Sequence, residues 1–118
     1  MLCVSINATA ESLPPQVNEL IPVLQKWGRD SVLVDAVSEH NTSELTIEKM
    51  KARDAEWRAT EGLDEQMKAL MESPAAKHLL MLEKTQPYFF EIFLMGNQGA
   101  NVAMTNKTSD YWQGDEAK

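Results

Sequence analysis

Residues 88–105 read Tyr88-Phe89-Phe90-Glu91-Ile92-Phe93-Leu94-Met95, Gly96-Asn97-Gln98-Gly99 and Ala100-Asn101-Val102-Ala103-Met104-Thr105. The first run is aromatic, β-branched and almost wholly apolar, which predicts a strand buried on both faces with its aromatic side chains in the core. The second run supplies turn residues, and the third predicts another strand. Together the three runs predict an antiparallel hairpin, and Pro87 stands where a missing amide is tolerated.

A helical pattern begins at Leu13-Pro14-Pro15, because proline is tolerated in a first helical turn. The apolar residues that then recur at helical spacing are Leu20, Leu24, Trp27, Val34 and Val37. This spacing predicts one long helix over roughly residues 15–40. Pro22 and Gly28 lie inside it, where a kink or a late start is compatible with the pattern.

The second helical pattern has a clear start signal. Thr46 can cap it, and Leu45 can pack on Met50 as a hydrophobic staple. Met50, Asp54 and Trp57 fall on one helical face, which predicts Trp57 as the core anchor, and Gly62 marks the end. Shorter helices are predicted over Leu63–Met71 and over Ala75 to about Lys84. The second of these follows a Ser73 cap and has Pro74 in its first turn.

Helices followed by a hairpin predict an α+β fold. A two-stranded sheet is marginal on its own and leaves an open edge that can pair with another strand. We therefore expect further strands to follow Lys118 in the complete protein.

Composition excludes several classes of function. The chain has 118 residues, 43% hydrophobic and 25% charged, which fits one globular domain. Its formal net charge of −7 leaves no basic face for nucleic acid. One cysteine and two widely separated histidines offer no metal-ligand spacing, and no nucleophile–base arrangement or phosphate-binding glycine loop is present. The sequence therefore predicts neither an enzyme nor a cofactor.

The N-terminus has the pattern of a cleaved leader. Residues 1–10 carry no charge and end in Ala8-Thr9-Ala10, the small-x-small pattern of a signal-peptidase site. We interpret residues 1–10 as a remnant of a signal peptide and residues 11–118 as the folded part. The alternative is a frayed N-terminal tail. The first interpretation predicts a periplasmic or other extracytoplasmic protein.

The C-terminal segments Asn97–Thr105 and Lys107–Glu116, the second carrying Ser109-Asp110-Tyr111-Trp112-Gln113-Gly114-Asp115-Glu116, resemble the extracytoplasmic sensor domains called Cache or PDC domains. These PAS-like modules occur in bacterial chemoreceptors and sensor kinases, and as free-standing periplasmic proteins. The resemblance implies a long N-terminal helix, short helices and an antiparallel PAS-like sheet of about five strands. Only the first hairpin of that sheet lies within residues 11–118, which would then be the N-terminal part of one such domain.

The resemblance also implies a ligand site formed by Asp110, Tyr111, Trp112 and Asp115. Carboxylates beside aromatic rings suit an amine, an amino acid or a similar metabolite. Alternatively, Tyr111 and Trp112 close the core and Asp110 caps a short helix. Glu91, the one charge in the apolar run, either faces the pocket, pairs with a lysine or lies at an exposed edge.

Three functions follow as expectations. The first is a small-molecule sensing domain that feeds signal transduction or chemotaxis, with homodimerisation through its N-terminal helix. The second is a free-standing periplasmic binding protein of the same fold. The third, from another class, is a helical structural or interaction module without a ligand.

Overall fold

The computed structural model describes residues 13–115 and shows the predicted α+β class, with helices and a two-stranded antiparallel sheet. The interpretation of residues 1–10 as a leader concerns residues outside the described range. The chain divides into two compact units, residues 1–30 and residues 31–118. Each unit is described by itself.

Unit 1 contains helix α2, Pro15–Trp27, which begins with proline in its first turn as the sequence indicates. The prediction of one long helix over residues 15–40 was wrong, because the next helix, α3, is separate and spans Ser31–Asn41. Backbone bonds end α2: Arg29 N–H donates to the Lys26 carbonyl at 3.1 Å, and Asp30 N–H donates to the Trp27 carbonyl at 3.0 Å. Each of these bonds joins an N–H to the carbonyl three residues before it, as in a 3₁₀-helix, and this tighter turn ends the α-helix.

In unit 2 the predicted hairpin is confirmed. Strand β1, Phe93–Met95, pairs antiparallel with β2, Asn101–Met104, and Leu94 lies opposite Ala103. An irregularity between Leu94 and Met95 shifts the register by one residue. Gly99 has a φ of 91°, a left-handed conformation that glycine adopts without strain. Its N–H donates to the Gly96 carbonyl at 3.1 Å, which closes the turn.

The first strand is shorter and more exposed than the sequence predicts. Residues 88–92 lie outside β1, and the prediction that the aromatic run is buried on both faces was wrong. Tyr88 is 51% exposed and Phe90 is 82% exposed. The last ladder bond joins Thr105 N–H to the Ile92 carbonyl at 3.0 Å. Because the described residues offer no partner strand before Ile92, the apolar run lacks the backbone pairing that a strand requires.

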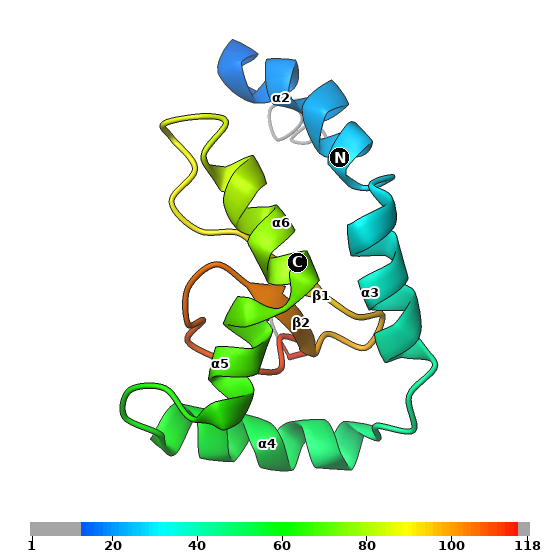
Figure 1. The fold of residues 1–118 in the computed structure, drawn as a ribbon, viewed down its shortest axis with the longest axis vertical. Coiled ribbons are helices and arrows are strands. Elements are labelled where there is room, and N and C mark those ends of the chain that lie inside the picture. The colour runs from blue at the N-terminus through cyan, green and yellow to red at the C-terminus, as the bar shows by residue number, and fades with distance from the viewer. Residues whose placement is uncertain (1–12, 116–118) are drawn as a thin grey trace, which may run out of the picture. The chain divides into compact units, whose positions relative to one another are not determined.

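Two hydrophobic clusters hold unit 2 together. The first contains Met50, Trp57, Met67, Ala100, Met104 and Tyr111. The second contains Leu33, Ala75, Ala76, Leu79 and Ala103, with Ile92 and Leu94 packed against it. Since neighbouring β2 residues point to opposite faces, Ala103 and Met104 join different clusters. Figure 1 shows α3 to one side of the hairpin of unit 2, and both strands contact this helix.

Helix α4, Ile47–Ala59, follows the predicted pattern. The Thr46 hydroxyl oxygen accepts a hydrogen bond from Lys49 N–H at 3.2 Å, and Leu45 packs against the first cluster. Met50, Asp54 and Trp57 are its buried residues, as their shared face predicts. Trp57 is fully buried, and its indole N–H donates to the Thr108 carbonyl at 2.8 Å. This residue therefore anchors α4 to the segment that follows β2.

Two short helices complete unit 2. Helix α5, Glu65–Glu72, is capped by Asp64, whose carboxylate accepts Met67 N–H at 2.9 Å. Helix α6, Pro74–Glu83, has the predicted Ser73 cap, whose hydroxyl accepts Ala76 N–H at 3.1 Å. Proline follows the cap at the first helical position, where its missing N–H is not needed.

Candidate functional site

The segment after β2 is fastened to the core through Tyr111. Its N–H donates to the buried carboxylate of Asp54 at 2.9 Å, and its carbonyl accepts Asn101 N–H at 2.9 Å. Its ring lies 5.5 Å from that of Trp57, and only 3% of the residue is exposed. Burial raises the pKa of the Tyr111 phenol above its usual value. These contacts place Tyr111 in the core, which was the alternative to a ligand-binding role.

Trp112 is half-buried beside Tyr111. Its backbone N–H donates to Asp54 at 3.1 Å, and its indole N–H donates to the Gln98 carbonyl at 2.8 Å. The ammonium of Lys51 lies 5.2 Å from the centre of its ring, within cation–π range. The Lys51 ammonium therefore occupies one face of the Trp112 ring, the kind of surface that a cationic ligand would contact.

The acidic residues of the predicted site are dispersed. Asp110 is half-buried, and its carbonyl accepts the Thr108 hydroxyl at 2.7 Å. No helix follows Ser109 in the described residues, so Asp110 has no helix to cap there. Asp115 is exposed beyond Trp112, and Glu91 is exposed just before β1, which matches the exposed-edge alternative for Glu91. The predicted ligand-binding role of these residues is untested by this arrangement and stays a prediction.

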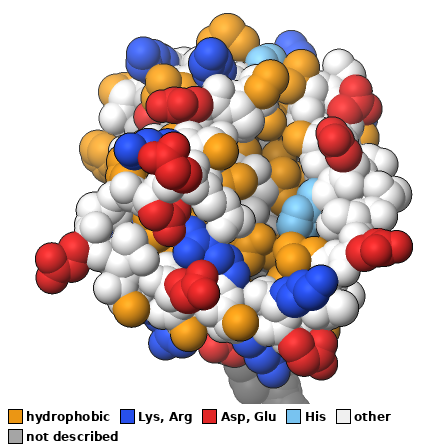
Figure 2. All heavy atoms as spheres, turned by 60° about the horizontal axis from the view of Figure 1, so that its bottom comes forward, with side chains coloured by type: hydrophobic (Ala, Val, Ile, Leu, Met, Phe, Trp, Pro, Cys, Tyr) orange, Lys and Arg blue, Asp and Glu red, His pale blue; other side chains and the backbone are white. Residues whose placement is uncertain are grey.

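A groove of about 640 Å³ lies elsewhere in unit 2, between α3, the α5–α6 junction and β2. We call it the α3–α6 groove. Its volume falls within the range of about 300–1,000 Å³ that is usual for small-molecule sites. Its lining residues are Val32, Asp35, Ala36, Glu39, His40, Ser43, Ser73, Pro74, Ala75 and Val102. Figure 2 shows one face on which hydrophobic side chains lie in a hollow, with a histidine beside them and acidic side chains around.

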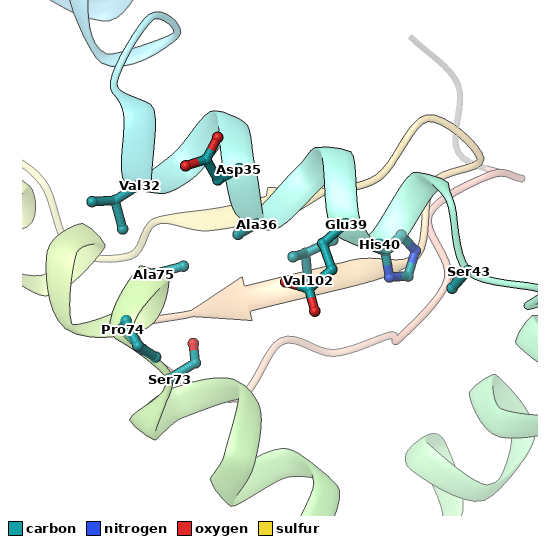
Figure 3. A pocket seen from close by; sticks show the side chains of 10 residues that line it. All are labelled: Val32, Asp35, Ala36, Glu39, His40, Ser43, Ser73, Pro74, Ala75 and Val102. Carbon is teal, nitrogen blue, oxygen red and sulfur yellow. The ribbon is translucent and has the colours of Figure 1, made fainter.

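The α3–α6 groove combines an apolar floor with carboxylates. Ala36 from α3 packs against the cluster that contains Ala75 of α6, and Val102 lines the groove from β2. Figure 3 shows Glu39 and His40 extending from α3 toward Val102, whereas the carboxylate of Asp35 points away from the strand. Asp35 and Glu39 are four residues apart and share a helical face. The Glu39 carboxylate beside apolar walls, with a second acidic residue, Asp35, also lining the groove, favours a ligand with a positive charge and an apolar body.

His40 stands where the α3–α6 groove meets the hairpin turn. Its ring lies against Gly96, so that a side chain at position 96 would overlap it. The next residue, Asn41, accepts Asn97 N–H on its side-chain oxygen at 2.9 Å, which ties the end of α3 to the turn. Burial lowers the pKa of His40 below its usual value near 6.5. The shift favours the neutral imidazole over the imidazolium, whose positive charge would repel a cationic ligand.

A second, more polar cavity of about 500 Å³ adjoins this point. It lies between the end of α3, the start of α4 and the hairpin turn, and it shares His40 and Ser43 with the α3–α6 groove. Glu44 and Glu48 add further negative charge to its lining. The two cavities together give this side of unit 2 an acidic character.

Within residues 13–115, no cluster of three or more His, Cys, Asp or Glu side chains is arranged to hold a metal ion. None of the helices described here has the length and apolar character needed to cross a bilayer.

The α3–α6 groove was not predicted from the sequence. Asp35 and Glu39 carry a weak signal, since an i,i+4 acidic pair next to Val32 and Ala36 marks one helical stripe. That stripe becomes a site only because the α5–α6 junction lies opposite it, and no local pattern shows that contact.

Comparison of the chain with protein-family models, curated proteins and solved structures finds no match.

Proposed function

We propose that this chain is a small-molecule sensing domain that binds an amine, an amino acid or a similar metabolite in the α3–α6 groove. In this proposal Asp35 and Glu39 attract the ammonium group of the ligand. Val32, Ala36 and Val102 contact its apolar part. The observation that carries the proposal is that the Glu39 carboxylate extends over an apolar floor in a groove of about 640 Å³, which Asp35 also lines.

The sensory context rests on the resemblance to the PAS-like Cache domains of extracytoplasmic receptors. An α+β chain with a hairpin that carries the Asn97–Thr105 motif is compatible with that family. The proposed location is periplasmic or otherwise extracytoplasmic. A free-standing periplasmic binding protein with the same groove is the second form of this proposal.

Calorimetric titration tests ligand binding. The chain would be titrated with short alkyl amines, α-amino acids and matched carboxylic acids that lack the amine. We expect heat from the amines and amino acids and none from the acids. A flat titration with every compound would favour the remaining alternative, a structural or interaction module without a ligand.

Neutralising one rim carboxylate tests the site itself. Glu39→Gln should weaken amine binding by about three- to fivefold, corresponding to about 1 kcal/mol for a solvent-accessible ion pair. Glu61→Gln is the matched control, because Glu61 is exposed on the loop after α4 and the substitution changes the net charge equally. Equal weakening by both variants would mean that overall charge, rather than the groove, attracts the ligand.

We further propose that α2 mediates homodimerisation. Val17, Ile21 and Leu24 are spaced by four and three residues, and each is at least 38% exposed. None of the residues of α2 is buried. An apolar helical stripe of this spacing fits a second copy of itself. Leu24→Glu should therefore lower the sedimentation coefficient of a dimeric sample to that of a monomer, and an unchanged coefficient would count against α2.

A further inference from the structure

Two cavities of unit 2 meet at the end of α3. The α3–α6 groove, of about 640 Å³, and the more polar cavity, of about 500 Å³, share the lining residues His40 and Ser43. We call the more polar one the turn cavity, because Asn97 and Gln98 of the hairpin turn line it. Figure 3 shows the α3 residues of the groove in order from Val32 to His40, with Ser43 beyond the histidine. His40 therefore stands at the boundary between the two cavities.

The His40 ring is held at this boundary from two sides. Ser43 N–H donates to the His40 carbonyl at 3.0 Å, which closes the last turn of α3. A methyl group at position 96 would lie 2.9 Å from Nε2 of His40, so the ring rests against the backbone of Gly96. Asn41 accepts Asn97 N–H at 2.9 Å and ties the same turn of α3 to the hairpin. Contacts within the protein therefore fix the ring where the cavities meet.

The two cavities carry charge of the same sign. Asp35 and Glu39 line the α3–α6 groove, and Glu44 and Glu48 line the turn cavity. Among the described residues that line either cavity there is no lysine or arginine. A second ammonium group on a ligand bound at Glu39 would be attracted by Glu44 and Glu48 if it could pass His40.

We propose that His40 is a specificity-determining residue: its ring separates the α3–α6 groove from the turn cavity, so that an α,ω-diamine binds no better than a monoamine. This role rests on the proposed function, because it concerns ligands of the same groove. The first ammonium group of a diamine binds at Glu39, and the second stays in solvent on the groove side of the ring. The carboxylates of Glu44 and Glu48 are then out of its reach.

The size of the effect follows from the exposure of these carboxylates. A second ion pair at a solvent-accessible site is worth up to about fivefold in affinity. An ammonium group that stays in solvent gains much less, because water and salt screen it. In the wild type a diamine should therefore exceed its matched monoamine only by about twofold, the statistical advantage of two equivalent ends. His40→Ala opens the passage and should add a further three- to fivefold, about the value of one such ion pair.

Calorimetric titration of the full chain measures this ratio. The probes are α,ω-diamines from butane to octane and the alkyl monoamines of the same lengths, at about pH 8, where histidine is neutral and amines are protonated. His40→Phe is the matched control, because it keeps a ring of similar bulk, and it should retain the wild-type ratio. Glu48→Gln added to His40→Ala should reduce the extra gain of the diamine.

The outcomes separate this role from the proposed function. The same ratio in the wild type, His40→Ala and His40→Phe would overturn the role of His40, while binding of the monoamines would still support the proposed function. A wild-type ratio above about fivefold that His40→Ala leaves unchanged would also overturn it, because the ligand would then pass the ring. Flat titrations with every compound would overturn the proposed function and the role of His40 together.

Urea denaturation tests the position of the ring without a ligand. Gly96 lacks the positive φ of Gly99, so its backbone accepts alanine, whose methyl group overlaps the His40 ring. The same methyl group would lie 2.9 Å from Oδ1 of Asn41, so part of its cost does not depend on His40. We expect Gly96→Ala to lower the urea midpoint of the wild type, and to lower that of His40→Ala by about half as much or less. Equal shifts would contradict the placement of the ring against Gly96. If His40→Ala unfolds, His40→Asn takes its place in both experiments, with the same expected directions.

Discussion

Removing the carboxylate of Asp54 should detach the segment after β2 from the core. Asp54 is 6% exposed, and one of its oxygens accepts N–H groups from Tyr111 at 2.9 Å and Trp112 at 3.1 Å. Its other oxygen pairs with the exposed guanidinium of Arg58 at 3.1 Å. No other hydrogen bond of these two N–H groups is found in the described chain, so Asp54→Ala leaves both donors without an acceptor.

The expected destabilisation follows from these two bonds. A hydrogen bond to a charged group contributes about 1.5–3 kcal/mol, and a buried donor left unsatisfied costs about 1–3 kcal/mol. We expect Asp54→Ala to lower the free energy of unfolding by about 3–5 kcal/mol, a large part of the roughly 5–15 kcal/mol available to a domain. Asp54→Asn keeps an acceptor oxygen and should lose about 1–2 kcal/mol.

Urea denaturation followed by tryptophan fluorescence measures the effect, since Trp57 and Trp112 both lie beside this junction. Glu56→Ala is the control, because its side chain is 72% exposed and its ion pair with Arg53 is long, at 3.5 Å. The control should change stability by less than about 0.5 kcal/mol. A loss below about 1 kcal/mol for Asp54→Ala would refute the account of how this segment is held.

Two further predictions concern the hairpin turn and the groove. Gly99→Ala should lower the free energy of unfolding by about 1–3 kcal/mol, because φ at this position is 91°. Gly28→Ala is the control, and at a φ of −63° it should change the free energy of unfolding by less than about 1 kcal/mol. Similar urea midpoints for the two variants would contradict this prediction. Burial lowers the pKa of His40 in the folded chain, so the unfolded chain binds a proton at this residue more readily than the folded chain does. The contribution of His40 to the free energy of unfolding should therefore be fully present above pH 6.5, the usual pKa of histidine, and should be lost as the pH falls through the pKa of the folded state. Urea midpoints of wild type and His40→Gln measured from neutral pH downward test this, and a difference that stays constant with pH would exclude it.

Much of unit 2 could be predicted from local signals. Thr46 and Ser73 are caps with the expected bonds, and Trp57 is the buried anchor that its helical face indicates. These features depend on residues within one turn of each other or on the period of a single helix. The hairpin turn was predicted for the same reason.

The errors arose where distant partners decide the structure. The apolar run before Phe93 has the composition of a buried strand, yet it lies outside the sheet because β2 offers no further residues to pair with it. Hydrophobicity predicts a strand only when a neighbouring strand satisfies its backbone. The prediction of one long helix was wrong for a different reason, since the backbone bonds of Arg29 and Asp30 end α2 at Trp27.

In the candidate site, too, the local motif could be recognised from the sequence, whereas the tertiary contacts could not. Asp110, Tyr111 and Trp112 form a recognisable motif, but the structure uses Tyr111 to close the core against Trp57. Asp35 and Glu39 carry no motif, and they line a groove only because α3 and the start of α6 pack on opposite sides of it. The location of the groove therefore depends on tertiary packing.

The most direct test of the proposed function is a titration of the isotope-labelled chain with an amine or amino acid that gives heat in calorimetry, followed by amide chemical shifts in NMR. We expect saturable shifts along Val32–Ser43 and at Ser73–Ala75, with the amides of Asp110–Asp115 unmoved. Shifts confined to Asp110–Asp115, or no saturable shifts with any compound of the panel, would contradict binding in the α3–α6 groove.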